Sequence, residues 1–215
     1  MNIEWVMFPN NGKIINLNIY ADNEHISNDI RKNNNFYEHR ALQFVYDTVP
    51  LYNKTVLDIG ANIGNHSVFF ETVCGAKVIA FEPNDKNYGL LSLNSKNKNI
   101  TPMRMLIGDN EIYTCESIDS ANMGTVKYMK AKAGETAIPI DALNFSDVAL
   151  IKIDVEGMEL EVLSGAMQTI KRCSPAIMIE IDTNKLGIMA ILEELGYNTY
   201  KLTCHSNTIL ALKDR

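Results

Sequence analysis

The chain has 215 residues, of which 46% are hydrophobic, and a formal net charge of -6 at pH 7. A chain of this length buries about 70% of the surface that its unfolded form exposes, so a single domain covering residues 1–215 is expected. The 20 basic residues are outnumbered by 26 acidic ones. A nucleic-acid partner is therefore not expected, because binding to a phosphate backbone requires a basic surface.

Cysteine spacing and apolar run lengths argue against three further features. The four cysteines are far apart and form no CxxC pair, which argues against a zinc site and against a disulfide framework. The N-terminus has no basic stretch followed by an apolar run, and no segment reaches the ~18 apolar residues of a membrane span. A cytoplasmic protein without a membrane span is expected.

Residues 1–50 are predicted to form an N-terminal cover for the core. The segment "FYEHRALQFVYDTVP" predicts a helix that Pro50 ends, and the residues before it are polar, asparagine-rich and weakly strand-like. The helix carries the apolar residues Leu42, Phe44, Val45, Tyr46 and Val49.

Residues 51–215 alternate short apolar runs with helical patterns, which predicts a parallel α/β sheet covered by helices on both faces. The predicted strands are "TVLDIG", "KVIAFEP", "MRMLIGD", "ALIKIDVEG" and "AIMIEID". Two helical stripes follow the fourth and fifth strands. The first stripe is Leu160, Leu163, Met167 and Ile170, and the second is Ile188, Ile191, Leu192 and Leu195.

Two segments interrupt this alternation. Residues 110–141 are strand-like with turn residues, which predicts an inserted hairpin beside the sheet. Its position makes it a candidate substrate wall, formed by Tyr113, Met123, Tyr128 and Met129. At the C-terminus, "NTYKLT" and "NTILALK" predict an antiparallel pair of strands.

The turn in "VLDIGANIG" is the first candidate for a binding site. In an open parallel sheet, ligands bind beyond the carboxyl ends of the strands. Gly60 and Gly64 permit a tight turn and a close approach of the backbone to a ligand, although both glycines are equally consistent with a sharp bend alone.

Glu82 makes the binding interpretation more specific. It ends the next strand, 22 positions after Gly60, where an acid that accepts the ribose hydroxyls of an adenosine ligand is expected. Asn62 stands where the dinucleotide fingerprint has its second glycine, so a pyrophosphate is not favoured.

These motifs carry a family resemblance. The segments "VLDIGANIGNHSVFF", "VIAFEPND", "MLIGD" and "LIKIDVEGMELEVLSGA", followed by "PAIMIEI", resemble the FkbM family of S-adenosylmethionine-dependent methyltransferases over roughly residues 37–181. The resemblance implies a Rossmann-like, doubly wound class I fold with a seven-stranded, mostly parallel sheet. It also implies a cofactor site. The methionine end of the cofactor would be lined by Asp58, Gly60, Ala61, Asn62 and Gly64, its ribose by Glu82, Pro83 and Asn84, and its adenine by Asp109. Tyr37 and Glu38 would close over the cofactor, and Asp154 would also bind it.

Methyl transfer to an oxygen requires alignment of the reactants and removal of a proton. Asp154 and Glu156 follow a strand next to the cofactor turn and are candidates for the base, although acids at a helix start are also common as caps. His66 is a further candidate for the base, or else an ordinary residue of the first helical turn. A divalent metal held by Asp154, Glu156 and Glu180 or Asp182 is a less favoured alternative.

The acceptor class is narrowed by a missing motif. Methyltransferases that act on planar exocyclic nitrogens carry an NPPY-like turn where this chain has "IDVEG". The resemblance instead suggests O-methylation of a hydroxyl on a sugar, a polysaccharide precursor or a secondary metabolite. The alternatives are a nicotinamide-dependent oxidoreductase, which is not favoured because Asn62 stands where the dinucleotide fingerprint has its second glycine, and a non-catalytic cofactor-binding protein.

Overall fold

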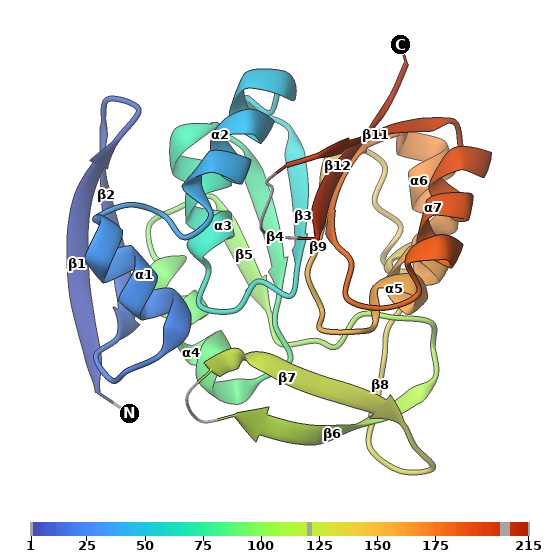
Figure 1. Ribbon diagram of the computed structural model, residues 1–215, viewed down its shortest axis with the longest axis horizontal. Coiled ribbons are helices and arrows are strands. Elements are labelled where there is room, and N and C mark those ends of the chain that lie inside the picture. The colour runs from blue at the N-terminus through green and yellow to red at the C-terminus, as the bar shows by residue number, and fades with distance from the viewer. Residues whose placement is uncertain (1, 120–121, 203–206, 215) are drawn as a thin grey trace.

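The computed structural model describes residues 2–119, 122–202 and 207–214. The side chains of residues 116–119 and 122–126 are outside this description, and the predicted wall residue Met123 is among them. The described part is built around one seven-stranded sheet (Figure 1).

The order of the strands in this sheet is β11-β12-β10-β9-β3-β4-β5. β12 runs antiparallel to both of its neighbours, and the other pairs are parallel. The strands are β3 (Thr55–Ile59), β4 (Lys77–Phe81), β5 (Ile100–Met103), β9 (Val148–Ile153), β10 (Ala176–Glu180), β11 (Tyr197–Lys201) and β12 (Thr208–Lys213). The predicted α/β class, the mostly parallel sheet and the antiparallel C-terminal pair are confirmed.

Helices cover both faces of the sheet because neighbouring strand residues point in opposite directions. Val56 packs in one apolar cluster and Leu57 packs in another on the opposite face. In Figure 1, α5 to α7 lie to the right of the sheet, and α2 to α4 lie on its other side. The helices are α2 (His39–Thr48), α3 (Asn65–Val68), α4 (Asp85–Asn94), α5 (Glu159–Gly165), α6 (Met167–Cys173) and α7 (Lys185–Glu194). A π-helical turn (Phe69–Val73) continues α3.

The third predicted strand was wrong in its position. The chain pairs with β4 through Ile100–Met103, not through residues 103–109, and Pro102 lies within this edge strand. An edge strand tolerates proline because only one of its sides needs ladder hydrogen bonds. Leu106 and Ile107 have already left the sheet, and Ile107 forms only an isolated bridge with Ile138.

The stripe from Leu160 to Ile170 is divided between two helices. α5 ends at Gly165, where a Cβ atom would lie 1.9 Å from the Gly108 carbonyl oxygen, and α6 begins at Met167. Leu163 and Ile170 are buried as expected, but the backbone bends between them.

The predicted N-terminal cover, residues 1–50, contains a hairpin and a helix before α2: β1 (Ile3–Asn10), β2 (Lys13–Tyr20) and α1 (His25–Asn33). Ile15, Leu17 and Ile19 of β2 are buried in the same apolar cluster as Val56 of the central strand. The Asn94 side chain of α4 joins the two parts, because it accepts from the Asn18 amide at 2.7 Å and donates to the Ile63 carbonyl oxygen at 2.8 Å.

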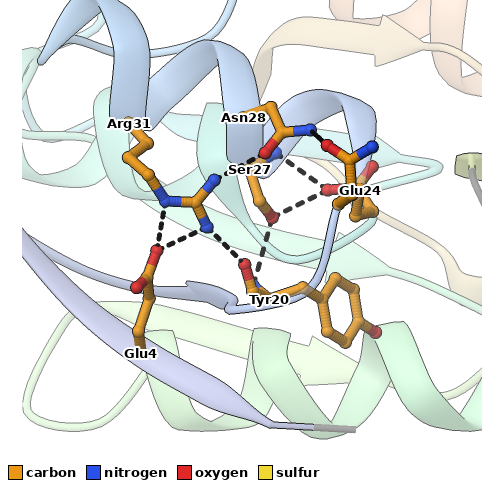
Figure 2. A network of polar contacts seen from close by, with 7 residues as sticks. Glu4, Tyr20, Glu24, Ser27, Asn28 and Arg31 are labelled. Carbon is orange, nitrogen blue, oxygen red and sulfur yellow. Dashed lines mark hydrogen bonds and ion pairs between the residues drawn. The ribbon is translucent and has the colours of Figure 1, made fainter.

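A polar network fastens α1 to this hairpin (Figure 2). Glu24 is 4% exposed and caps the helix, since its carboxylate accepts from the Ile26 amide and from the Ser27 amide and hydroxyl. Arg31 Nε donates to Glu4 at 2.6 Å, and Arg31 Nη2 donates to the Tyr20 carbonyl oxygen at 2.9 Å. Hydrogen bonds therefore hold both the start and the end of α1 in place.

The inserted segment forms a separate three-stranded sheet from β6 (Ile112–Asp119), β7 (Asn122–Lys130) and β8 (Glu135–Thr136). This hairpin crosses the lower edge of the view in Figure 1, and β7 contacts α1. Over the ranges that the structure describes, none of the helices combines the length and the apolar character that crossing a bilayer requires.

Candidate active site

A sharp turn after β3 presses the backbone against the end of β9. Gly60 has φ +75°, and a Cβ atom on it would lie 1.7 Å from the Asp154 carbonyl oxygen. The Gly60 and Ala61 amides both donate to the Phe81 carbonyl oxygen, at 3.0 and 2.9 Å. Only glycine fits at position 60, so its first role is to let two strand ends meet.

Asn62 and Gly64 provide the remaining left-handed positions of the turn, with φ +52° and +89°. Asparagine adopts this region more readily than most residues. A Cβ atom on Gly64 would lie 2.9 Å from Leu91 Cδ1, so helix α4 packs directly against the turn.

Glu82 joins this turn to the one that follows β4. Its carboxylate is buried and accepts from the Asn62 amide at 2.8 Å and from the Asn84 amide at 2.9 Å. Burial raises the pKa of Glu82 to about 7, although the two amides act in the opposite direction. Each carboxylate oxygen has a second lone pair, so Glu82 is still able to accept hydrogen bonds from a ligand.

Lys152 lies beneath the turn and binds three groups. Its Nζ is 3.2 Å from Asp58 Oδ1 and 3.3 Å from Asp154 Oδ2, and it donates to the Gly60 carbonyl oxygen at 2.7 Å. Burial alone would lower the pKa of Lys152, but the two carboxylates raise it above its ordinary value. Asp58 is fully buried, accepts from the Ser67 hydroxyl at 2.5 Å, and supports the turn from below.

A cavity of about 210 Å³ opens above these turns, at the carboxyl edge of the sheet. Several of the predicted site residues line it, namely Tyr37, Gly60, Asn62, Glu82, Pro83, Asp154 and Glu156. An apolar wall completes the lining, formed by Ile59, Phe81, Met105, Leu106, Ile107 and Val155.

Other predicted positions lie outside this lining. Asp109 is directed to the hairpin, where its carboxylate accepts from the Tyr113 hydroxyl at 2.9 Å and pairs with Lys130 at 2.8 Å. The strand before it ends at Met103, and Asp109 is not among the residues that line the cavity. Asn84 caps α4 by accepting from the amides of residues 86 and 87. Asp58, Ala61 and Gly64 shape the turn but do not line the cavity.

His66 and Glu38 form a buried pair behind the cavity. His66 Nε2 is 3.4 Å from Glu38 Oε2, and the ring stacks on Phe70. Burial would raise the pKa of Glu38, but His66 and Lys152 hold it below its ordinary value. Neither residue is among those that line the cavity.

Acidic side chains occupy the β9–β10 side of the cavity. Burial, and then the charges of Asp154 and Asp182, raise the pKa of Glu156 to about 7. Burial, and then the charges of Asp154, Glu38 and Asp182, raise the pKa of Glu180 to about 8. Within the described ranges, no three His, Cys, Asp or Glu side chains converge in a way that would hold a metal ion.

Several lining residues were missed by sequence reasoning. His25 and Ile26 of α1 reach the cavity from the N-terminal cover, and Asn87 reaches it from α4. Tyr128 of the hairpin also lines it, as its position in the predicted wall suggested. Lys152 could have been found, because a lysine inside the apolar run "ALIKID" requires a buried acidic partner.

Comparisons with known proteins agree with this architecture. A model of the methyltransferase FkbM domain matches residues 58–199. The hexuronic acid methyltransferase AglP of Haloferax volcanii is 31% identical over 153 residues, which are 66% of this chain and 62% of that protein.

Two solved structures share the fold. The FkbM methyltransferase of Methylobacillus flagellatus KT superposes with a TM-score of 0.59 at 18% identity, over 83% of this chain and 49% of that one. The Pyrococcus abyssi tRNA (uracil-54, C5)-methyltransferase was solved in complex with S-adenosyl-L-homocysteine. It superposes with a TM-score of 0.53 at 11% identity, over 97% of this chain and 44% of that one.

This chain therefore spans less than two thirds of the length of each of these relatives. The family model nevertheless covers most of the chain, including the turn after β3 and the acids after β9. The chain belongs to the FkbM methyltransferase family.

Proposed function

We propose that this protein is an S-adenosylmethionine-dependent methyltransferase that methylates a hydroxyl of a sugar, a polysaccharide precursor or a secondary metabolite. The observation that carries the proposal is the convergence of the Gly60 turn and the Glu82 carboxylate on one cavity. The likeness to a hexuronic acid methyltransferase supports a sugar-like acceptor.

The residues around the cavity fit the parts of this cofactor. Glu82 would accept from the ribose hydroxyls with the lone pairs that Asn62 and Asn84 leave open. The apolar wall that includes Leu106 and Ile107 would hold the adenine, in place of Asp109. Gly60, Tyr37 and Asp154 would surround the methionine end. When bound, the cofactor would supply a methyl group activated by a sulfonium.

The charge of the cavity suits that chemistry. Glu82, Asp154, Glu156 and Glu180 line it, and its described lining includes no lysine or arginine. Carboxylates stabilise a sulfonium cation, and they also disfavour an anionic acceptor close to the methyl group. An uncharged hydroxyl compound is therefore the acceptor we favour, and the carboxylate of a hexuronic acid would have to point away from these acids.

The role of Glu82 is testable by pairing a variant with a modified ligand. We expect wild-type protein to bind S-adenosylhomocysteine about 10-fold or more tightly than its 2′-deoxy analogue, because a hydrogen bond to a charged group contributes roughly 1.5–3 kcal/mol. In Glu82→Gln this preference should shrink markedly. An equal preference in both proteins would contradict the ribose assignment, whatever the variant does to overall affinity.

Simple measurements distinguish two alternative functions from the proposed one. A nicotinamide-dependent oxidoreductase would be stabilised in a thermal-shift assay by NADH rather than by S-adenosylmethionine, and Asn62 in the second glycine position argues against it. A non-catalytic cofactor-binding protein would bind S-adenosylhomocysteine but leave methyl-labelled cofactor unconsumed with every member of a hydroxyl-compound panel. Consumption with transfer of label to a neutral sugar is the outcome we expect.

A further inference from the structure

The four carboxyl groups that line the cavity differ in the hydrogen bonds and ion pairs that they already make within the protein. Glu82 accepts from two backbone amides, and Asp154 pairs with Lys152. Burial and then the charge of Asp154 raise the pKa of Glu156, and Asp182 lies close enough for its charge to raise this pKa further. Within the ranges that the structure describes, no hydrogen bond or ion pair reaches the carboxyl group of Glu180 or of Glu156, so both groups are open to a ligand, and their positions distinguish them.

The position of Glu180 places it next to the cofactor turn. It is the last residue of β10, and the preceding residue, Ile179, lies in register with Ile153 of β9. Glu180 therefore ends its strand beside Asp154, and both residues line the main cavity. Glu180 also lines a small hollow behind the cavity, together with Lys152 and Glu38.

We propose that Glu180 is the proton acceptor for the substrate hydroxyl, an inference that rests on the proposed methyltransferase function. As the hydroxyl oxygen forms its bond to the methyl carbon, the carbon–sulfur bond breaks with its electron pair remaining on sulfur. The hydroxyl proton passes to the Glu180 carboxylate, which later releases it to solvent. Charge balances because the sulfonium becomes a neutral thioether while the carboxylate becomes a carboxylic acid.

The surroundings of Glu180 make it a better base than an exposed glutamate. Burial and neighbouring acids raise its pKa to about 8, so its carboxylate form accepts a proton readily near neutral pH. Lys152 acts in the opposite direction. The charged and titratable groups that influence it come from several elements: Asp154 and Lys152 of the β9 segment, Glu38 before α2, Asp182 after β10, and Tyr37, whose pKa the Glu180 charge in turn raises.

The first test compares Glu180→Gln with wild type and with the exposed control Glu194→Gln on α7. We expect Glu180→Gln to lower kcat by about 100-fold or more, the usual contribution of a general base. The rise of wild-type kcat/KM with pH toward about 8 should be absent in this variant. Affinity for S-adenosylhomocysteine should stay within about threefold, since its thioether is uncharged. Glu180→Asp should retain the pH dependence at a reduced rate.

A second readout does not depend on activity. In carboxyl-labelled protein saturated with S-adenosylhomocysteine, the carbon NMR signal that Glu180→Gln removes should titrate between about pH 6 and 9, above the ordinary glutamate range. A signal that titrates below pH 6 would overturn the assignment. So would an unchanged rate profile in Glu180→Gln, or loss of the pH dependence only in Glu156→Gln. If wild type fails to bind S-adenosylhomocysteine, the proposed function itself is wrong.

Discussion

The cavity has a floor and a roof that are held in place by different kinds of contact. The floor consists of the turn after β3 and the ends of β4, β9 and β10, where Lys152 and Asp58 are 2% and 0% exposed. The roof consists of α1 and β7, and the contacts that fasten α1 include partly exposed groups such as Arg31 and Glu4. A buried charge has no access to water if its partner is lost, whereas an exposed one is solvated again. Changes to the floor should therefore destabilise the fold, and changes to the roof should act mainly on binding.

The largest effect is expected from Lys152→Met. This variant leaves the buried Asp58 carboxylate without its cation, which should cost about 3–5 kcal/mol in the free energy of unfolding. Denaturant unfolding measures this value. The exposed control Lys171→Met should change it by less than about 0.5 kcal/mol. The double variant Asp58→Asn/Lys152→Met should recover part of the loss, and a double variant no more stable than Lys152→Met would show that charge pairing is not the cause.

Gly60→Ala is the next most severe test of the floor. The new Cβ atom would meet the Asp154 carbonyl oxygen in a residue with φ +75°, so overpacking and strain should cost about 2–5 kcal/mol. The matched control is Gly187→Ala in α7, where nothing lies within 4 Å of the added Cβ atom. That change should stabilise the protein by about 0.4–1 kcal/mol, because alanine favours a helix more than glycine does. Equal effects at the two positions would contradict the close contact.

The floor and the roof also differ in how well the sequence predicts them. Gly60, Asn62, Glu82 and Asp154 line one cavity, as expected, because parallel strands end at the same edge and the positions of strand ends are sufficient to bring their residues together. Pro102 obscured the edge strand, so the predicted strand was assigned too late in the chain, and Asp109 does not directly follow the strand as expected. Lys152 was overlooked although it lies inside a quoted motif.

The roof could not be derived in the same way. Residues 1–36 have weak local patterns, and their placement depends on contacts with distant segments, such as the hydrogen bond between Asn18 and Asn94. Tyr128 was predicted as a wall residue only from the position of the insertion. No local pattern indicates that α1 contacts β7, because such a contact is fixed by tertiary packing rather than by the periodicity of either segment.

A third prediction concerns the effect of pH on the floor. The pKa of Glu82 is about 7 in the folded protein and is raised above its ordinary value of 4.5. Between these pH values the folded state retains a proton that the unfolded state has released, so the free energy of unfolding should fall as pH rises from about 4.5 to 7. One such group changes stability by at most about 1.4 kcal/mol per pH unit.

Denaturant unfolding at pH 5, 6 and 7 measures this slope. Glu82→Gln should flatten it, since the amide does not titrate, and the flattening is independent of any constant loss from a weakened hydrogen bond to Asn62 or Asn84. Glu156 and Glu180, whose pKa values are also raised, should leave a residual fall in the variant. Parallel slopes in the two proteins would exclude Glu82 as the titrating group.

The smallest effect on stability is expected in the roof. Glu24→Ala removes the carboxylate that caps α1 and should cost about 0.5–2 kcal/mol in the free energy of unfolding, while the exposed neighbour Asp22→Ala should cost less. Because His25 and Ile26 line the cavity, loosening the start of α1 should still weaken S-adenosylhomocysteine binding, measured by calorimetry, more than Asp22→Ala does. A variant that loses stability but binds as tightly as wild type would show that the floor alone holds the ligand, and α1 would then be a cover for the core rather than part of the site.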